Sequence, residues 1–200
     1  MLTSNKISSL VIDSLREQTC EQNTAVLSLY CDYRAQEDQS AVNIVGSLLS
    51  QVASRAMRIP VEIQSAFELK ERGGQSLRLP DMVKLFAKTI SSIERVYICF
   101  DGLDELLPQN RSELLRAVRQ LIRNAPNMRL FLTGRPYIRR ELDKHLTNEA
   151  YIIHIVPDRG DITRYVSQKI DDDDDRNPDL MPDHLKHGIL KIMLEKVSEM

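Results

Sequence analysis

Long apolar segments are missing from this chain of 200 residues. No run approaches the roughly 20 apolar residues that cross a bilayer. The first segment, "MLTSNKISSLVIDSLREQ", also lacks the uninterrupted apolar core of a signal peptide. Both absences predict a cytoplasmic protein. Neither charge sign dominates, because the formal net charge is −2 and the signs are interspersed. Without a basic stripe, the pattern gives no support for a nucleic-acid or membrane partner.

Cysteine and histidine are also too sparse for a metal site or a disulfide framework. Cys20, Cys31 and Cys99 are unevenly spaced, and two of them fall within or beside sequence typical of strands. This spacing favours reduced, mostly buried thiols. His184 and His187 have no further histidine or cysteine nearby, so we expect them to be exposed polar residues.

No Gly-x-x-x-x-Gly-Lys-Ser/Thr sequence occurs in the chain. The glycine loop and lysine that hold the β- and γ-phosphates of a nucleotide are therefore absent, and Lys6 has no glycine loop before it. A nucleophile elbow and a metal-ligand cluster are absent as well. Their absence argues against an unrelated α/β hydrolase or phosphatase.

The sequence does contain enough apolar residues, 42%, for one α/β domain with a core and a small helical appendage. Apolar runs typical of buried strands alternate with segments of helical periodicity. This alternation predicts a mostly parallel sheet in a three-layer α/β fold. The predicted strands are residues 25–33, 95–100, 128–134 and 151–156, and the helices between and after them are 40–56, 81–93, 111–124, 135–146, 162–170 and 184–200.

Capping residues predict where several helices begin. Asn110 and Glu113 have the spacing of a capping box, Pro136 stands near a helix start, and Asp161 is a candidate cap for the helix after it. Beyond these, residues 171–183 are acidic and contain proline, which predicts a solvated linker to a final helix. The five consecutive aspartates lack the alternating spacing and glycine of a calcium loop.

Acidic residues follow the apolar strand "VYICF" directly: Asp101, Asp104 and Glu105. Ligands bind beyond the carboxyl ends of strands in parallel sheets, so these side chains are predicted to lie at the functional edge. A carboxylate there suits a hydrated magnesium ion, and a second one can orient the attacking water in phosphoryl transfer. The alternative is that Asp-Gly-Leu-Asp-Glu is only a turn followed by a helix cap.

"VYICFDGLDEL", followed about thirty residues later by "MRLFLTGRP", resembles the extended Walker B and sensor 1 motifs of NACHT-type NTPases. These belong to the STAND class of P-loop proteins, which includes fungal NACHT and ankyrin-repeat proteins and nephrocystin-like N-terminal domains. Gly134 stands where serine is usual in that class. "ISSLVIDSLRE" resembles the helix after the P-loop, "VLSLYCDYRAQEDQSAVNIVGSLLSQV" the second strand and its helix, and "LEKVSEM" the start of the helical region that follows the nucleotide domain.

The resemblance implies a role for five residues. Asp101 would be the magnesium-associated Walker B residue, and Asp104 and Glu105 the catalytic acidic pair that supports hydrolysis. Thr133 and Arg135 would be the nucleotide-binding sensor 1 residues that contact the γ-phosphate. Independently, a guanidinium at the carboxyl end of a strand is suited to bidentate phosphate contact, although an ion pair with Asp101 or Asp104 is the alternative.

The resemblance also implies a domain organisation. Residues 1–158 would be a NACHT-like core that begins after the P-loop and its strand, and 159–200 the start of a helical extension with an acidic linker at 171–183. The class has strand order 5-1-4-3-2, with the P-loop strand between the sensor strand and the last strand. The first three predicted strands can therefore pair side by side, whereas the segment at 151–156 would lack its neighbour.

The implied function is part of a nucleotide-dependent signalling switch that is inactive alone. Its cofactors in the intact domain would be Mg²⁺ with ATP or GTP, and two alternatives stay open for this chain by itself: it binds them, or it binds none. Protein partners would come through oligomerisation or through repeat domains of the full-length protein. The alternative is a non-catalytic protein-interaction fragment that has lost nucleotide binding.

Overall fold

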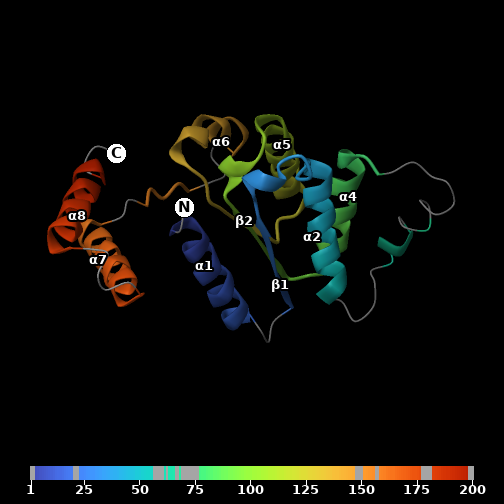
Figure 1. The fold of residues 1–200 in the computed structure, drawn as a ribbon. Helices are drawn as coiled ribbons and strands as arrows, with labels where there is room; N and C mark the ends of the chain where they lie inside the picture. The colour runs from blue at the N-terminus through green and yellow to red at the C-terminus, as the bar shows by residue number, and fades with distance from the viewer. Residues whose placement is uncertain are drawn as a thin grey trace. The chain divides into compact units, whose positions relative to one another are not determined.

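The computed structural model describes residues 3–19, 23–55, 61, 63–65, 68, 77–146, 151–155, 158–176 and 182–197. The chain divides into two compact units, residues 1–150 and 151–200. The first unit contains a parallel sheet with helices on both faces (Figure 1), which confirms the predicted α/β fold class. Among the helices within these ranges, none is long and apolar enough to span a membrane.

Three strands form the sheet, in the order β1 (Thr24–Tyr30), β2 (Arg95–Asp101) and β3 (Met128–Leu132). Both pairings are parallel, with Leu27 opposite Ile98 and Ile98 opposite Leu130. The first three predicted strands therefore lie side by side, as expected. β2 is central and its last four residues are buried, which explains why its sequence is an uninterrupted apolar run.

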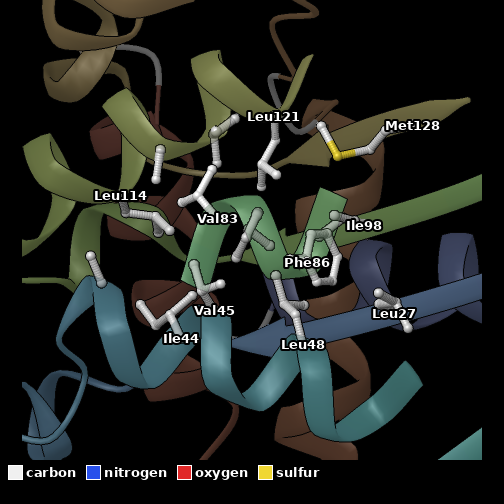
Figure 2. Packing of buried hydrophobic residues seen from close by; sticks show 14 of the residues in the cluster. Leu27, Ile44, Val45, Leu48, Val83, Phe86, Ile98, Leu114, Leu121 and Met128 are labelled. Carbon is white, nitrogen blue, oxygen red and sulfur yellow. The ribbon is translucent and has the colours of Figure 1, made fainter. Parts of the chain in front are cut away.

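Helices α2 (Ala41–Arg55), α4 (Leu79–Ile90) and α5 (Pro108–Asn124) pack together on one face of the sheet. Their apolar residues recur at helical spacing and meet alternate strand residues in the main core (Figure 2). Helix α1 (Thr3–Thr19) contacts β1 and β2 and packs Ile12 against Val26 and Cys99 in a smaller cluster. Because successive strand residues point to opposite faces, Leu27 and Ile98 join the main core instead. The sheet thus has helices on both sides.

Two helix starts differ from the sequence prediction. α5 begins at Pro108 and not after Asn110, because proline at the first helical position has a preset φ and lacks the N–H that would be unsatisfied there. The Asn110 side chain lies within the helix and donates to the carbonyl of Gln36, so no capping box forms. By contrast, the 3-10 turn η3 (Pro136–Ile138) leads into α6 (Arg139–Leu146), which confirms the helix predicted after Pro136.

The second unit contains α7 (Arg159–Arg176) and α8 (Asp183–Val197), which pack on each other. Asp158, not Asp161, accepts the N–H of Gly160 at the start of α7. Asp171 to Asp175 continue α7, so the predicted linker at 171–183 is helical through Arg176. The predicted end of the helix at Ile170 was therefore too early, because a charged segment can extend a helix that is already nucleated.

Residues 151–155 form no strand, which corrects the prediction of a strand at 151–156; Val156 lies outside the described residues. Tyr151, Ile153 and Ile155 are well exposed, at 103%, 81% and 64%. The composition is typical of a strand, but a strand needs a neighbour for its backbone groups. Within the described ranges no strand other than β2 pairs with β3. This is the outcome expected for a strand sequence that lacks its neighbour.

The outer edge of β1 is covered by polar side chains of α2. The amide of Gln51 accepts the N–H of Ser28 at 3.0 Å and donates to the Ser28 carbonyl at 2.9 Å. Arg55 Nη1 donates to the carbonyl of Val26 at 3.1 Å. These bonds occupy backbone groups that a further strand would use, and so protect this edge from pairing with another chain.

We predict that Gln51→Leu destabilises the first unit by about 1–2 kcal/mol, because it leaves the N–H and carbonyl of Ser28 without their partners. Urea unfolding will measure the stability, and light scattering over a concentration series will measure self-association at the uncovered edge. Gln120→Leu, on the exposed side of α5, is the control. Unchanged stability and association in Gln51→Leu would contradict this account of the edge.

Candidate functional site

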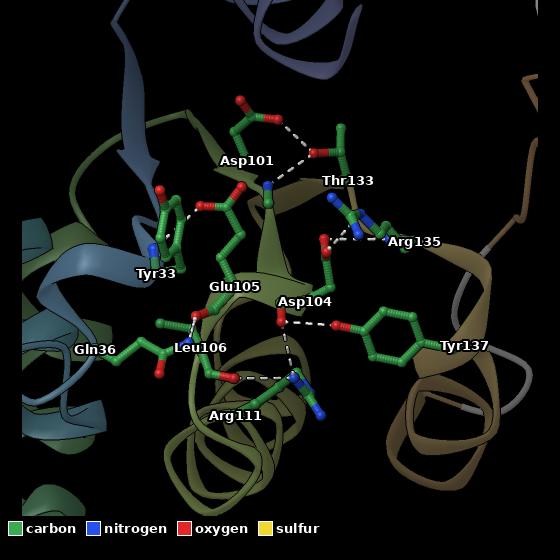
Figure 3. A network of polar contacts seen from close by, with 11 residues as sticks. Tyr33, Gln36, Asp101, Asp104, Glu105, Leu106, Arg111, Thr133, Arg135 and Tyr137 are labelled. Carbon is green, nitrogen blue, oxygen red and sulfur yellow. Dashed lines mark hydrogen bonds and ion pairs between the residues drawn. The ribbon is translucent and has the colours of Figure 1, made fainter. Parts of the chain in front are cut away.

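Asp101 and Thr133 meet at the carboxyl edge of the sheet because β2 and β3 are parallel neighbours that end at the same level. Asp101 is only 3% exposed. Its Oδ1 atom accepts the hydroxyl of Thr133 at 2.5 Å and the hydroxyl of Ser8, from α1, at 2.6 Å. Figure 3 shows the Thr133 hydroxyl pointing toward Asp101. The N–H of Gly102 donates to the same hydroxyl at 2.9 Å. A buried carboxylate thus joins α1, β2 and the segment after β3.

Gly102 makes the turn that follows Asp101. Its φ of 71° lies in the left-handed region, which side chains rarely adopt. The turn directs Leu103 into the core. It also begins the 3-10 turn η2 (Leu103–Glu105), which places the carboxylates of Asp104 and Glu105 against neighbouring segments of the chain. We refer to residues 102–106 as the acidic loop. The N–H of Leu103 donates to the carbonyl of Thr133 at 2.9 Å, which holds the loop against the end of β3.

Asp104 forms an ion pair with Arg135, with Nε and Oδ2 3.3 Å apart. The main-chain N–H of Arg135 also donates to Oδ1 of Asp104 at 3.2 Å. The Asp104 side chain is 9% exposed and that of Arg135 is 61% exposed, so the carboxylate is fixed while much of the guanidinium faces solvent. Asp101, Asp104 and Arg135 are therefore gathered at one edge, as predicted, and Arg135 adopts the ion pair that was its alternative interpretation.

Glu105 lies on the other side of the acidic loop, toward the connection between β1 and α2 (Figure 3). Its Oε2 atom accepts the N–H of Tyr33 at 3.2 Å. Its main-chain carbonyl accepts the side-chain amide of Gln36 at 2.6 Å. The predicted acidic pair is thus separated: Asp104 contacts the segment after β3, and Glu105 contacts the segment after β1.

Arg111, on α5, was not predicted as a site residue. It is 6% exposed and its Nη1 atom lies 3.0 Å from the carbonyl of Leu106 and 3.4 Å from that of Asp104. Its Nε atom lies 2.7 Å from Oε2 of Glu141 on α6. Buried arginines are rare unless paired. This one holds the acidic loop in place through the carbonyls of Leu106 and Asp104. The sequence signal for it was weak: an arginine on the apolar face of a helix.

Gly134 differs from the class that the sequence resembles, in which serine is usual at this position. A Cβ atom built on Gly134 would lie 2.6 Å from the δ-methyl group of Ile138. Ile138 is 2% exposed and belongs to the main core. Because glycine has no side chain, it leaves room for Ile138 of η3 to pack against the end of β3.

The charges of the acidic loop act on a nearby thiol. Burial, together with the smaller effects of the carboxylates of Glu105, Asp101 and Asp104, raises the pKa of Cys31 to about 12. Cys31 is free and buried, as is Cys99, which confirms the prediction for these two residues. Cys20 lies outside the described residues. The carboxylates of Asp101, Asp104 and Glu105 therefore all disfavour the thiolate form of Cys31, although each has a different hydrogen-bonding partner.

No group of three or more histidine, cysteine or acidic side chains in the described part of the chain is arranged to hold a metal ion. His184 and His187 are exposed, as predicted. The carboxylates of Asp101, Asp104 and Glu105 point to separate partners (Figure 3). The arrangement is therefore not a protein-only metal cage.

A family model described as Nephrocystin 3, N-terminal matches residues 5–135, more than half of the chain. The chain belongs to the nephrocystin 3 N-terminal family. Comparisons with curated proteins and with solved structures gave no match. The nephrocystin-like part of the resemblance is thereby confirmed. The span that matches the nephrocystin 3 family contains β1, β2, β3 and all five predicted site residues, and it ends at Arg135.

In this nephrocystin-like domain we expect Arg111→Met to be destabilising by about 3 kcal/mol, because it leaves Glu141 partly buried without its partner and the carbonyl of Leu106 without a donor, whereas the carbonyl of Asp104 keeps the hydroxyl of Tyr137. Urea unfolding will measure the loss. Arg116→Met, an exposed position on the same helix, should change stability by less than about 0.5 kcal/mol. Equal effects of the two substitutions would contradict the role of Arg111.

Cys31 should react far more slowly with a thiol reagent at pH 8 in the folded domain than in urea, since its thiolate is suppressed and its side chain buried. The raised pKa also predicts a stabilising contribution that is present below pH 9 and is lost as the pH rises toward 12, because the unfolded thiol ionises first. The measurement is labelling and unfolding in a Cys20→Ser background. Cys31→Ala should lose less stability above pH 9, and an identical alkaline profile would refute the prediction.

Proposed function

We propose that this domain is part of a nucleotide-dependent signalling switch of the NACHT type, in the STAND class of P-loop NTPases, and that it acts in the cytoplasm. The observation that carries the proposal is the junction at the carboxyl edge of β2 and β3. There a buried aspartate, the threonine after the next strand and an acid–arginine pair lie in one network. Phosphoryl-transfer sites need such positioned charges more than they need covalent chemistry.

In this proposal Asp101 is the Walker B residue. Its one buried carboxylate, with the hydroxyls of Ser8 and Thr133 beside it, fits a hydrated Mg²⁺ ion, which binds proteins through one or two carboxylates and otherwise through water and phosphates. The bound ion would neutralise phosphate charge. Asp101 would hold it, with Thr133 fixing the orientation of the carboxylate. The divergent carboxylates of the acidic loop agree with this mode better than with a protein cage.

Arg135 and Thr133 are the proposed sensor 1 residues. Arg135 is mostly exposed and held by Asp104, so it is charged, positioned and accessible to a phosphate. Asp104 and Glu105 are the proposed acidic pair that supports hydrolysis. Because both are engaged with protein groups, we interpret the structure as a resting arrangement in which nucleotide phosphates would compete with Asp104 for Arg135.

A non-catalytic interaction module is the second candidate function. It is favoured by the absence of the glycine-rich phosphate loop from the sequence and by the internal partners of Arg135 and Glu105. In that case the same network would serve only to fix the loops at the carboxyl edge. In both candidate functions the partners of the chain would be proteins, reached through oligomerisation or through repeat domains of a longer polypeptide.

The 200-residue chain should not hydrolyse ATP or GTP above background with Mg²⁺. The reason is that it has no phosphate cradle, and positioning and charge stabilisation supply most of the catalysis in phosphoryl transfer. Phosphate release by the purified chain is the measurement. Magnesium-dependent turnover that Glu105→Gln abolishes would overturn the expectation.

Binding distinguishes the two candidate functions. In a titration with Mg²⁺ and ATP or GTP, the switch predicts shifts of the amide resonances of Gly102 and Thr133 and about tenfold weaker binding in Asp101→Asn, which keeps the acceptor oxygen but removes the charge. Asp38→Asn, in the connection after β1, is the matched control. An interaction module predicts no nucleotide-dependent shift at these amides. That result, in a folded chain, would reject the nucleotide switch for this chain.

A further inference from the structure

Helix α6 is held to the first unit by a small contact surface. It is eight residues long and packs on α5 and η3. Of its residues only His145 and Leu146 are buried, and Leu142 packs against the main core from a half-buried position. A helix this short is marginal by itself and depends on its tertiary contacts. Each polar contact of α6 therefore affects how readily the helix opens.

The buried end of α6 contains an unsatisfied polar atom. His145 is 6% exposed, and its Nε2 atom is buried with no hydrogen-bond partner among the residues that the structure describes. A buried nitrogen without a partner raises the free energy of the docked helix, because water bonds to that nitrogen once the helix opens. α6 is therefore poised to open when another of its contacts is lost.

One guanidinium joins α6 to the acidic loop. Nε of Arg111 donates to Oε2 of Glu141, on α6, at 2.7 Å. The Nη1 atom of Arg111 donates to the carbonyl of Leu106 at 3.0 Å and lies 3.4 Å from that of Asp104 (Figure 3). Because the guanidinium is planar and rigid, it bonds both sides only while the loop and α6 keep their spacing. A shift of the acidic loop must therefore break a bond of Arg111.

The position of the acidic loop depends in turn on Arg135. The side chain of Asp104 is 9% exposed, and its Oδ2 atom lies 3.3 Å from Nε of Arg135. A carboxylate this buried is costly without its cation, so loss of the guanidinium favours a loop position in which Asp104 faces water. The guanidinium itself is mostly exposed, at 61%, and is the part of the network that a ligand can reach.

We propose that Arg111 couples these two contacts, so that α6 opens from α5 when Arg135 leaves Asp104. The acidic loop shifts, Arg111 follows its carbonyls, and Glu141 loses its partner. The ligand that draws Arg135 away rests on the proposed function, in which it is a nucleotide phosphate. The coupling itself needs no nucleotide, because contacts within the chain carry it.

Hydrogen exchange of the amides at 143–146 measures the opening of α6, and exchange of the β2 amides at 98–100 measures global unfolding. Arg135→Met should speed exchange in α6 about fivefold or more, with a smaller change in β2. Arg135→Lys keeps the charge and should restore most of the protection. The matched control is Arg34→Met, at an exposed arginine that pairs with Asp32 at 3.2 Å after β1. It should change α6 exchange by less than about twofold.

Double-mutant cycles test whether Arg111 carries the coupling. Glu141→Ala removes the acceptor on α6, keeps a strong helix former, and should speed α6 exchange by itself. In that background Arg135→Met should add less than about twofold, because the connection is already broken. In Arg111→Lys, which keeps the charge but lacks the planar fork, Arg135→Met should also lose its effect.

Tyr137→Phe is the control for the cycles. The hydroxyl of Tyr137 donates to the carbonyl of Asp104 at 3.0 Å, so this substitution removes a different bond to the acidic loop. Arg135→Met should keep its full effect on α6 in this background. If the effect disappears there but persists in Arg111→Lys, the coupling runs through Tyr137 and the role of Arg111 is overturned.

His145→Leu tests whether α6 is poised to open. Leucine is of similar size and has no polar atom, so the substitution removes the unsatisfied nitrogen. Exchange at 143–146 should become slower, with β2 unchanged. Unchanged or faster exchange in α6 would show that the buried nitrogen does not favour opening.

Two further results would overturn the proposal. One is α6 exchange that Arg135→Met leaves unchanged or raises only together with β2, since the opening would then be absent or global. The other is multiplication of the separate effects of Arg135→Met and Glu141→Ala in the double variant, which would make the two contacts independent. If the variants behave as expected but Mg²⁺ and ATP or GTP do not bind, the proposed function fails and the coupling stands.

Discussion

The buried carboxylate of Asp101 is the interaction on which the carboxyl edge of the sheet depends. Moving an unpaired carboxylate out of water is costly, so its position requires donors that cannot move away. Ser8 and Thr133 are such donors because α1 and β3 hold them in place. The same demand for donors fixes α1 on its face of the sheet and sets the level at which β2 and β3 end.

The acidic loop that follows Asp101 connects the carboxyl edge of the sheet to two neighbouring segments of the domain. Through Glu105 it contacts the connection that leads into α2, and through Asp104 and Arg111 it contacts the segment that leads into α6. A ligand that displaced either carboxylate would therefore release a different part of the domain. Arg111 has the central place here, because one guanidinium bonds two loop carbonyls and a carboxylate on another helix.

Periodicity was sufficient to predict the three strands of the sheet and most helices, because residues such as Leu27, Phe86 and Ile98 are buried by rules that act over a few neighbours. The gathering of Asp101, Thr133 and Arg135 was predictable too, since parallel strands bring their carboxyl ends together. Ser8 and Glu141 were not predictable, because a hydroxyl or carboxylate on a helix is usually solvated and their partners are distant in sequence. The segment at 151–155 was misassigned because a strand depends on a neighbour that local sequence does not encode.

The side chains of Gln51 and Arg55 on the β1 edge give the sheet a direction of growth. With one margin occupied by an amide and a guanidinium, and the other bordered in the described ranges by no further strand, any additional strand can join only beside β3. The edge of β3 is therefore where the sheet could be extended by another strand. This asymmetry limits the ways in which the domain can misassemble during folding.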